Sequence, residues 1–217
     1  MVTKSRPPGL DRPAARIKRV GGRLCLDFAN TVGGWEPAPG EGRFVVRDDR
    51  LREYPDLVAW AAAAGALAES DAAAVLRGAD GRSSEAAAVL ARARRLREAL
   101  YRTGWRLAHG RAPVREDLAI MEREIRLARQ HERLSGSERG LAWTLQNDPA
   151  ALDLPLWPVA LSAEEYLTTG DVGRLRACPG DECGWLFEDA SRNHSRQWCD
   201  MRDCGNVAKV RRYRSRH

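Results

Sequence analysis

The stretch that decides the C-terminal part of the fold is residues 178–205, which read CPGDECGWLFEDASRNHSRQWCDMRDCG. Its four cysteines follow the spacing Cys178-x4-Cys183-x15-Cys199-x4-Cys204. Zinc takes thiolate ligands in a tetrahedron, and two short loops that each carry a cysteine pair can converge on one ion. The spacing therefore predicts one structural Zn²⁺ held by all four thiolates. Because four protein ligands leave no position for water or substrate, the pattern argues against zinc catalysis.

The rest of the sequence favours a metal site over disulfides. The N-terminus is basic but no apolar segment follows it, so we expect no secretion signal and a cytoplasmic protein. The chain has no apolar run long enough to predict a membrane span. In a reducing cytoplasm a cysteine cluster binds metal more often than it forms disulfides. His194 lies between the two pairs and is a substitute ligand in principle, but four cysteines already complete the set.

Positive charge is concentrated after the last cysteine. The chain carries a net charge of +6, but nearly all of its basic residues are arginines, a skew that GC-rich coding also produces. Residues 205–217 stand out because they contain five basic residues and no acidic one. Read as a helix, this segment suits phosphate contacts, and the loop before Trp198 offers further polar groups. The candidate nucleic-acid contacts are Arg192, Asn193, Arg196, Lys209, Arg211, Arg212, Arg214 and Arg216. The alternative is a solvated tail whose charge offsets that of the zinc thiolates.

The N-terminal part predicts a mainly helical domain. Residues 1–22 are basic and rich in Pro and Gly, which favours a flexible arm. The alternation over 24–28 and the run at 44–46 predict two strands of a small sheet. Periodicity predicts helices over 54–67, 70–78, 83–107, from 113 to the Ser135-Gly136 pair and over 156–167, with another strand at 141–145. The fold class is therefore α+β: a helical domain over 23–170, then a zinc finger over 171–217 that ends in a basic helix.

Two features of the helical domain leave a ligand site open. Asp27, Asn30 and Thr31 lie at the end of the predicted first strand, where mixed folds often form pockets. The alternative is that Asn30 and Thr31 form a turn and cap the next segment. Four tryptophans line a cavity or, as we prefer, the core: Trp35, Trp60, Trp143 and Trp157. The sequence shows no phosphate loop, nucleophile elbow or acid–base constellation, so we do not expect an enzyme.

The C-terminal motif resembles a known family. The pattern Cys-x4-Cys-Gly-Trp-Leu-Phe, followed by Arg-x-Trp-Cys-x4-Cys-Gly-Asn, closely resembles the CGNR zinc finger. Upstream, LCLDFANT at residues 24–31 resembles the opening of the ABATE domain that usually precedes this finger. The family is described as stress-induced transcription regulators, and the resemblance implies a DNA-binding finger. One position departs from the name motif, because Val207 stands where the family has arginine.

Together these features predict a cytoplasmic, zinc-dependent, DNA-binding transcription regulator. Its N-terminal domain would sense a small-molecule effector or mediate homodimerisation, and no membrane partner is expected. A finger that binds a protein or RNA is the first alternative, which apolar finger surface and no DNA binding at low salt would favour. An enzymatic N-terminal domain is the second, which a metabolite bound beside Asp27 would favour.

Overall fold

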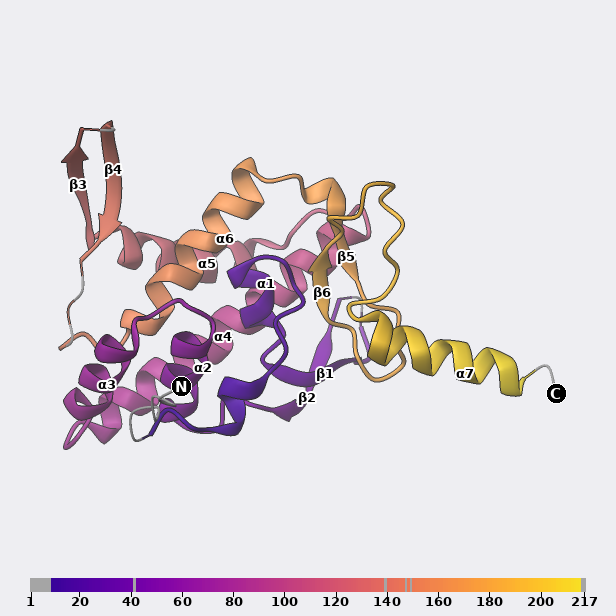
Figure 1. Cartoon of the computed structure of the whole chain (residues 1–217), viewed down its shortest axis with the longest axis horizontal. Helices are drawn as coiled ribbons and strands as arrows, with labels where there is room; N and C mark the ends of the chain where they lie inside the picture. Colours follow the sequence, from indigo (N-terminus) through magenta and orange to yellow (C-terminus); the bar gives the residue numbers. More distant parts are fainter. Residues whose placement is uncertain (1–8, 41, 139, 147, 149, 216–217) are drawn as a thin grey trace, which may run out of the picture.

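Helices form most of the structure, and small antiparallel sheets are attached to them (Figure 1). The computed structural model describes residues 9–40, 42–138, 140–146, 148 and 150–215. Within these residues there are three sheets, each a single pair of strands. The predicted α+β class is confirmed. No helix in this described part is long and apolar enough to cross a membrane.

The elements follow one another in a simple order. The helices are α1 (Leu24–Ala29), α2 (Tyr54–Ala63), α3 (Glu69–Gly78), α4 (Ser83–Ala108), α5 (Arg115–Arg129), α6 (Trp157–Thr169) and α7 (Asn206–Arg214). The paired strands are β1 (Val32–Pro37) with β2 (Phe44–Asp49), β3 (Glu132–Ser137) with β4 (Gly140–Leu145), and β5 (Leu175–Ala177) with β6 (Leu186–Glu188). Short 3₁₀ turns lie at Pro13–Arg16, Leu154–Leu156 and Val172–Arg174, and one π-helical turn lies at Met201–Gly205.

The long helix α4 is central to the core. Its buried face carries Val89, Leu96 and Leu100, as the periodicity predicts. It packs against α1, α2 and α5, and it also reaches β5 and β6. Gly104 makes room for the last contact, because a Cβ there would lie 2.5 Å from Leu186 Cδ1. The C-terminal segment is therefore packed directly on the main helix of the body.

Several arginines of α4 bind carboxylates of the body, so this helix does not carry a free basic stripe. The side chain of Arg97 is only 1% exposed, and both of its terminal nitrogens donate to Asp49, at 2.6 and 2.8 Å. Two further pairs join α4 to α5, namely Arg92 with Glu124 (2.7 Å) and Arg102 with Asp117 (2.6 Å).

Residues 24–29 form the helix α1 and not the strand that their alternation predicts. Cys25, Leu26, Phe28 and Ala29 are all buried, because α4 and α6 cover this short helix. Five alternating residues cannot separate a buried helix from a strand, since either one can bury residues on more than one side. The first sheet begins only after α1, where β1 pairs with β2.

Residues 9–22 lie against the body, in contrast to the flexible arm expected over 1–22. Leu10 and Ala14 are fully buried, and the turn at Pro13–Arg16 packs on α2. Arg12 donates to Asp56 of α2 at 2.5 Å. These contacts correct the expectation for residues 9–22, while residues 1–8 lie outside the described part of the chain.

The β3–β4 hairpin projects from the end of the body opposite α7 (Figure 1). The predicted strand at 141–145 is present, but α5 ends at Arg129, before the expected Ser135-Gly136 boundary. Trp143 pairs across the hairpin with Leu134 and is 62% exposed, so the core interpretation is wrong for this tryptophan. The core interpretation holds for Trp35, Trp60 and Trp157, which are buried.

Candidate metal centre

The first cysteine pair lies in the turn of the β5–β6 hairpin. Cys178 directly follows β5, and its N–H donates to the Trp185 carbonyl at 2.8 Å, which closes the turn. Gly184 has a φ of +65°, a left-handed conformation that favours glycine. A Cβ on Gly180 would lie 3.2 Å from Cys204 Sγ. The loop backbone thus approaches the sulfur atoms closely.

The second cysteine pair leads directly into the C-terminal helix. The π-helical turn Met201–Gly205 contains Cys204, and α7 follows it without a break. The Asp200 carboxylate caps this turn by accepting the Arg202 N–H at 2.8 Å. Cys199 is buried and Cys204 is partly buried. The position of α7 therefore depends on where these two sulfur atoms are held.

The four sulfur atoms of Cys178, Cys183, Cys199 and Cys204 form one compact cluster. All lie within 4.8 Å of one another. The Cys183 and Cys199 sulfurs are 3.5 Å apart, and the Cys199 and Cys204 sulfurs are 3.7 Å apart. Zn–S bonds of about 2.3 Å in a regular tetrahedron place the sulfurs about 3.8 Å apart. The donor set and its spacing therefore fit a tetrahedral metal ion.

The thiols of this cluster influence one another's ionisation. Hydrogen bonds from Cys183 and Cys199 lower the pKa of Cys178 to about 2. The same hydrogen-bond network, with Cys178 and Cys183 as partners, raises the pKa of Cys199. One thiolate is stabilised by its neighbours, and a divalent cation would allow the others to ionise as well. A ligand set of this kind binds metal with release of protons.

Arg196 organises the loop between the two cysteine pairs. Its guanidinium stacks over the Phe187 ring, with 4.4 Å from Cζ to the ring centre. It also donates to four backbone carbonyls, those of Trp198 (3.1 Å), Glu188 (3.3 Å), Val20 (3.0 Å) and Cys199. The sequence predicts Arg196 as a nucleic-acid contact, but the chain itself takes up these donors. Arg196 therefore has a structural position inside the finger.

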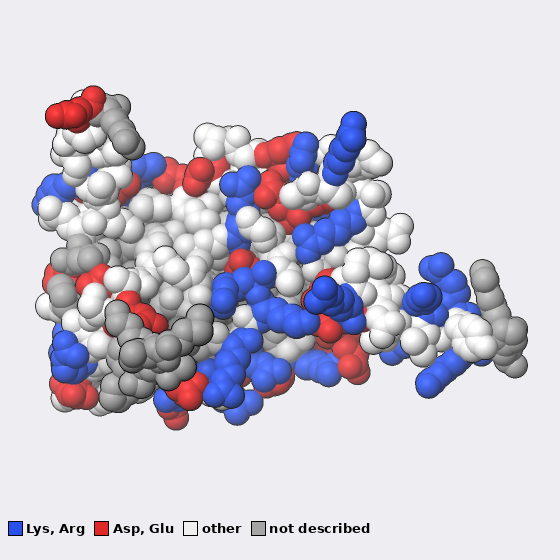
Figure 2. All heavy atoms as spheres, in the orientation of Figure 1, with Lys and Arg blue, Asp and Glu red and all other residues white. Residues whose placement is uncertain are grey.

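The predicted C-terminal helix is present, and it points away from the body (Figure 1). Lys and Arg atoms surround this projection, whereas charges of both signs mix over the rest of the visible face (Figure 2). Lys209, Arg212 and Arg214 are exposed on it, and α7 contains no acidic residue. Of the other predicted contacts, Arg192 and Asn193 are exposed in the loop, Arg211 pairs with Asp181, and Arg216 lies outside the described residues.

The apolar residues of α7 are exposed. Val207, Val210 and Tyr213 are 50%, 41% and 67% exposed, respectively. The helix leaves the finger within its first turns, so most of its surface faces solvent on all sides.

The three predicted ligand residues are occupied by backbone contacts. Asn30 is fully buried, and its amide binds the backbone N–H and carbonyl of Leu186 in β6 at 2.9 and 2.8 Å. The Thr31 hydroxyl donates to the carbonyl three residues earlier at 2.8 Å. Asp27 accepts the Gly21 N–H at 2.8 Å, and burial raises the pKa of its carboxyl to about 6. These contacts hold the three side chains within the fold, so the turn interpretation of Asn30 and Thr31 describes them better than a ligand pocket does.

The finger is built into the helical body. Leu175 of β5 and Leu186 of β6 belong to the same buried core as the helices. Gly34 of β1 lies so close to the first cysteine loop that a Cβ there would be 2.1 Å from the Glu182 carbonyl oxygen. No sequence pattern predicts this contact between β1 and the first cysteine loop. The Gly33-Gly34 pair is the sequence feature that marks this contact, but from the sequence alone it looks like part of a loop.

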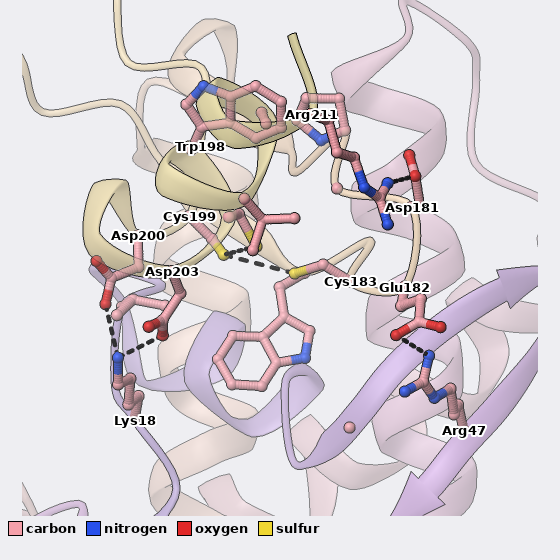
Figure 3. Close-up of a pocket in the computed structure, with 18 residues that line it drawn as sticks. Lys18, Arg47, Asp181, Glu182, Cys183, Trp198, Cys199, Asp200, Asp203 and Arg211 are labelled. Carbon is pink, nitrogen blue, oxygen red and sulfur yellow. Dashed lines mark hydrogen bonds and ion pairs between the residues drawn. The ribbon is translucent and has the colours of Figure 1, made fainter. Parts of the chain in front are cut away.

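An open cavity of about 470 Å³ adjoins the cysteine cluster (Figure 3). Trp185 and Trp198 contribute aromatic surface to its wall, and Val207 contributes apolar surface from α7. Three groups of ion pairs also line it: Lys18 with Asp200 and Asp203, Arg47 with Glu182, and Arg211 with Asp181. No sequence pattern predicts this cavity, because its wall combines segments that are more than a hundred residues apart.

Two family models match the chain, one after the other. Residues 22–170 match ABATE, described as a putative stress-induced transcription regulator, and residues 174–217 match the CGNR zinc finger. Neither description is that of an enzyme. Among curated proteins, none matches this chain. The first match covers more than half of the chain and the second contains all four clustered cysteines, so the chain belongs to the ABATE family and carries a CGNR zinc finger at its C-terminal end.

Proposed function

We propose that this chain is a zinc-dependent, DNA-binding transcription regulator. The observation that carries the proposal is α7, which projects from the body with Lys209, Arg212 and Arg214 exposed and with no acidic residue of its own. A cationic helix that stands clear of the surface can enter a groove or follow a phosphate backbone. Because each neutralised phosphate releases counterions, its binding should depend strongly on salt.

Zinc has a structural role in this proposal. Cys178, Cys183, Cys199 and Cys204 supply the full tetrahedral ligand set and would leave no position for a substrate. The ion would fix the π-helical turn that contains Cys204, and α7 continues directly from that turn. We therefore expect metal binding and DNA binding to be lost together.

The helical part over residues 23–170 would sense an effector or mediate self-association in the cytoplasm. One face of the β3–β4 hairpin exposes Leu134, Leu141 and Trp143. This apolar surface supports self-association as one of the two roles. The boundary near residue 170 separates two family matches but not two cores, since β5 and β6 share the core of the helices. We propose that the two parts fold and work as one unit.

The test compares two triple variants of the zinc-loaded chain on a short DNA duplex of mixed sequence. Replacing Lys209, Arg212 and Arg214 by alanine should weaken binding at low salt by at least about a hundredfold and reduce the salt slope by up to about 3. The matched control replaces Arg77, Arg123 and Arg133, which are exposed elsewhere, and it removes the same charge. Fluorescence anisotropy over a salt series gives both quantities. Equal losses in the two variants, or equal binding by zinc-loaded and zinc-stripped protein, would overturn the proposal.

A protein-binding finger is the second candidate, and the exposed apolar residues of α7 favour it. Val210 and Tyr213 are exposed on this helix. If α7 binds a protein, changing both residues to serine should abolish capture of that partner, and the chain should show no DNA binding at low salt. RNA is tested in the same anisotropy series with a strand of matching sequence.

A further inference from the structure

The cavity beside the cysteine cluster is assembled from several separate parts of the chain. The N-terminal segment supplies Lys18, β2 supplies Arg47, and the two cysteine loops supply most of the remaining wall. The first turns of α7 close it with Val207 and Arg211. Its volume of about 470 Å³ falls within the range of small-molecule sites. Anything bound in this cavity would therefore touch both the body and the projecting helix.

The charged groups of the cavity wall do not balance. Four carboxylates (Asp181, Glu182, Asp200 and Asp203) accompany three cations (Lys18, Arg47 and Arg211). Arg47 is engaged with Glu182 at 2.9 Å, and Arg211 is engaged with Asp181. The excess negative charge lies at Asp200 and Asp203, which share the single ammonium of Lys18 (Figure 3). A phosphate or carboxylate ligand would meet repulsion there, and a cation would be attracted.

Val207 marks the position from which a fourth cation is missing. It follows Asp203 by four residues, a spacing at which an arginine on a helix would reach back to that carboxylate. The matching family model is named after the motif Cys-Gly-Asn-Arg, whose arginine falls at this position, and this chain has valine there. The substitution leaves apolar surface on the cavity wall and leaves Lys18 to serve two carboxylates.

The aromatic part of the wall completes the chemistry. Trp185 and Trp198 both line the cavity, and Trp185 is held in place because its indole N–H donates to the Val32 carbonyl at 3.1 Å. Aromatic faces attract organic cations as well as apolar bodies. We propose that this cavity binds an organic cation with a flat apolar body, such as an amidine or a protonated aromatic amine. Its charge would lie beside Asp200 and Asp203, and its body would lie against the two tryptophans.

Binding would also act on α7, and this part of the inference rests on the proposed function. Arg211 is held to the first cysteine loop by Asp181, at the rim of the same cavity. A ligand in contact with Val207 and with this rim would favour one position of the helix over others. Because allosteric coupling is reciprocal, the cation would change DNA affinity by the factor by which DNA changes cation affinity.

Benzamidine, benzamide and benzoate form a nearly isosteric probe series of charge +1, 0 and −1. Each is titrated into zinc-loaded chain labelled with 5-fluorotryptophan, and the fluorine resonances of Trp185 and Trp198 are assigned from Trp→Phe variants. Benzamidine should shift these two resonances and bind at least about tenfold more tightly than benzamide, and benzoate should not bind. Val207→Arg should weaken benzamidine by about tenfold or more, because it supplies the missing cation within the chain. Val210→Arg, one turn further along α7 and outside the cavity wall, should bind like the original chain.

Equal binding of all three probes would overturn the cation site. A benzamidine affinity that is the same in Val207→Arg and in Val210→Arg would overturn it as well. The regulatory part is read separately, by DNA anisotropy at constant ionic strength with and without benzamidine. A change of about threefold or more in the original chain but not in Val207→Arg supports it. Unchanged DNA affinity with a filled cavity overturns the coupling alone, and absence of any DNA binding overturns the proposed function while the fluorine result stands.

Discussion

The helices α4 and α7 are both rich in arginine, yet their arginines have different surroundings. On α4, Arg97 is buried and holds Asp49 through two hydrogen bonds, and other arginines of that helix bind carboxylates of α5. On α7, Arg212 and Arg214 are exposed, and no ion pair joins them to another residue of the described part. The same residue type therefore stabilises the body in one helix and is available to a partner in the other.

This difference shows why the net charge of the chain says little about its function. Most of the positive charge of α4 is compensated within the body, whereas that of α7 is not compensated within its own helix. The carboxylates that face a basic residue in three dimensions decide its role, and these come from distant parts of the sequence. Asp49 lies 48 residues from Arg97, for example.

Loss of the metal should have the largest effect on this comparison. Cys199→Ser removes a buried ligand, and the position of α7 depends on the cluster, whereas the ion pairs of α4 do not. We expect the variant to lose its stoichiometric zinc and its DNA binding, with a drop in melting temperature because β5 and β6 share the core. Elemental analysis, anisotropy and thermal melting measure the three effects.

The fifth cysteine provides the control for that experiment. Cys25 is buried in α1, far from the cluster in sequence, so Cys25→Ala should retain about one zinc per chain. If Cys25→Ala lost zinc as Cys199→Ser does, the assignment of the four ligands would fail. If Cys199→Ser kept its zinc and its DNA affinity, α7 would not depend on the metal.

Removal of the Arg97 guanidinium should destabilise the body without changing the affinity of the chain for DNA. Burial alone would raise the pKa of Asp49, but the hydrogen bonds and charge of Arg97 lower it below the usual range. Arg97→Met leaves this carboxylate without its main partner and should cost about 3 kcal/mol of unfolding free energy at pH 7. The loss should shrink on acidification, because the stabilisation from a lowered carboxyl pKa disappears as the pH falls through the folded value.

Chemical denaturation over a pH series tests the Arg97 prediction. Arg95→Met is the matched control, since Arg95 lies two residues away on the same helix and is exposed. It should change stability by less than about 0.5 kcal/mol. DNA affinity measured well below the melting temperature should be the same in both variants. A selective loss of DNA binding in Arg97→Met would contradict the division of roles between the two helices.

Asp27 is a partly buried carboxylate of the body whose contacts do not fully offset the cost of its burial. Changing it should affect stability less than the loss of Arg97. Burial raises its pKa from 3.8 to about 6, although the Gly21 N–H and the charge of Arg19 act in the opposite direction. The folded chain therefore holds the proton more tightly than the unfolded chain, and stability falls as the pH rises from about 4 to about 6. Asp27→Asn keeps an acceptor for Gly21 and should add about 1–2 kcal/mol at pH 7.5, after allowance for partial exposure.

The gain from Asp27→Asn should decrease toward zero near pH 4. Both proteins carry the same cysteine cluster and lose metal alike on acidification, so the difference between their unfolding free energies isolates the Asp27 carboxyl. A gain that does not change with pH would mean that the amide acts through packing and not through the removal of a charge.

Spacing and periodicity predict much of this molecule because they are local properties. The cluster of Cys178, Cys183, Cys199 and Cys204 follows from the spacing of two matched loops, and the buried face of α4 follows from its period. The helix α1 does not follow, because its apolar residues alternate over too short a stretch to reveal which period applies.

Contacts between distant segments are what the sequence could not predict. From the sequence, Gly34 looks like a loop glycine and Gly104 like an irregularity in a helix. In the structure, Gly34 lies against Glu182 of the first cysteine loop, and Gly104 lies against Leu186 of β6. Arg196 has the composition of a nucleic-acid contact, but four backbone carbonyls surround its guanidinium. The cavity beside the cluster cannot be predicted from the sequence for the same reason, because Lys18 contacts Asp200 only in the folded chain.

The smallest expected effect concerns Arg211, the arginine of α7 that most resembles those of α4. It is paired with Asp181 although both side chains are more than half exposed. Asp181→Asn releases Arg211 and should raise DNA affinity about two- to fourfold, the range expected for an exposed ion pair. Glu182→Gln is the matched control, because it removes the same charge from the next residue while its partner is Arg47 of the body. Anisotropy titrations at one salt concentration compare the two variants. If both raise affinity equally, the gain reflects net charge alone; if only Asp181→Asn does, the availability of an arginine on α7 limits binding, as the contrast with α4 requires.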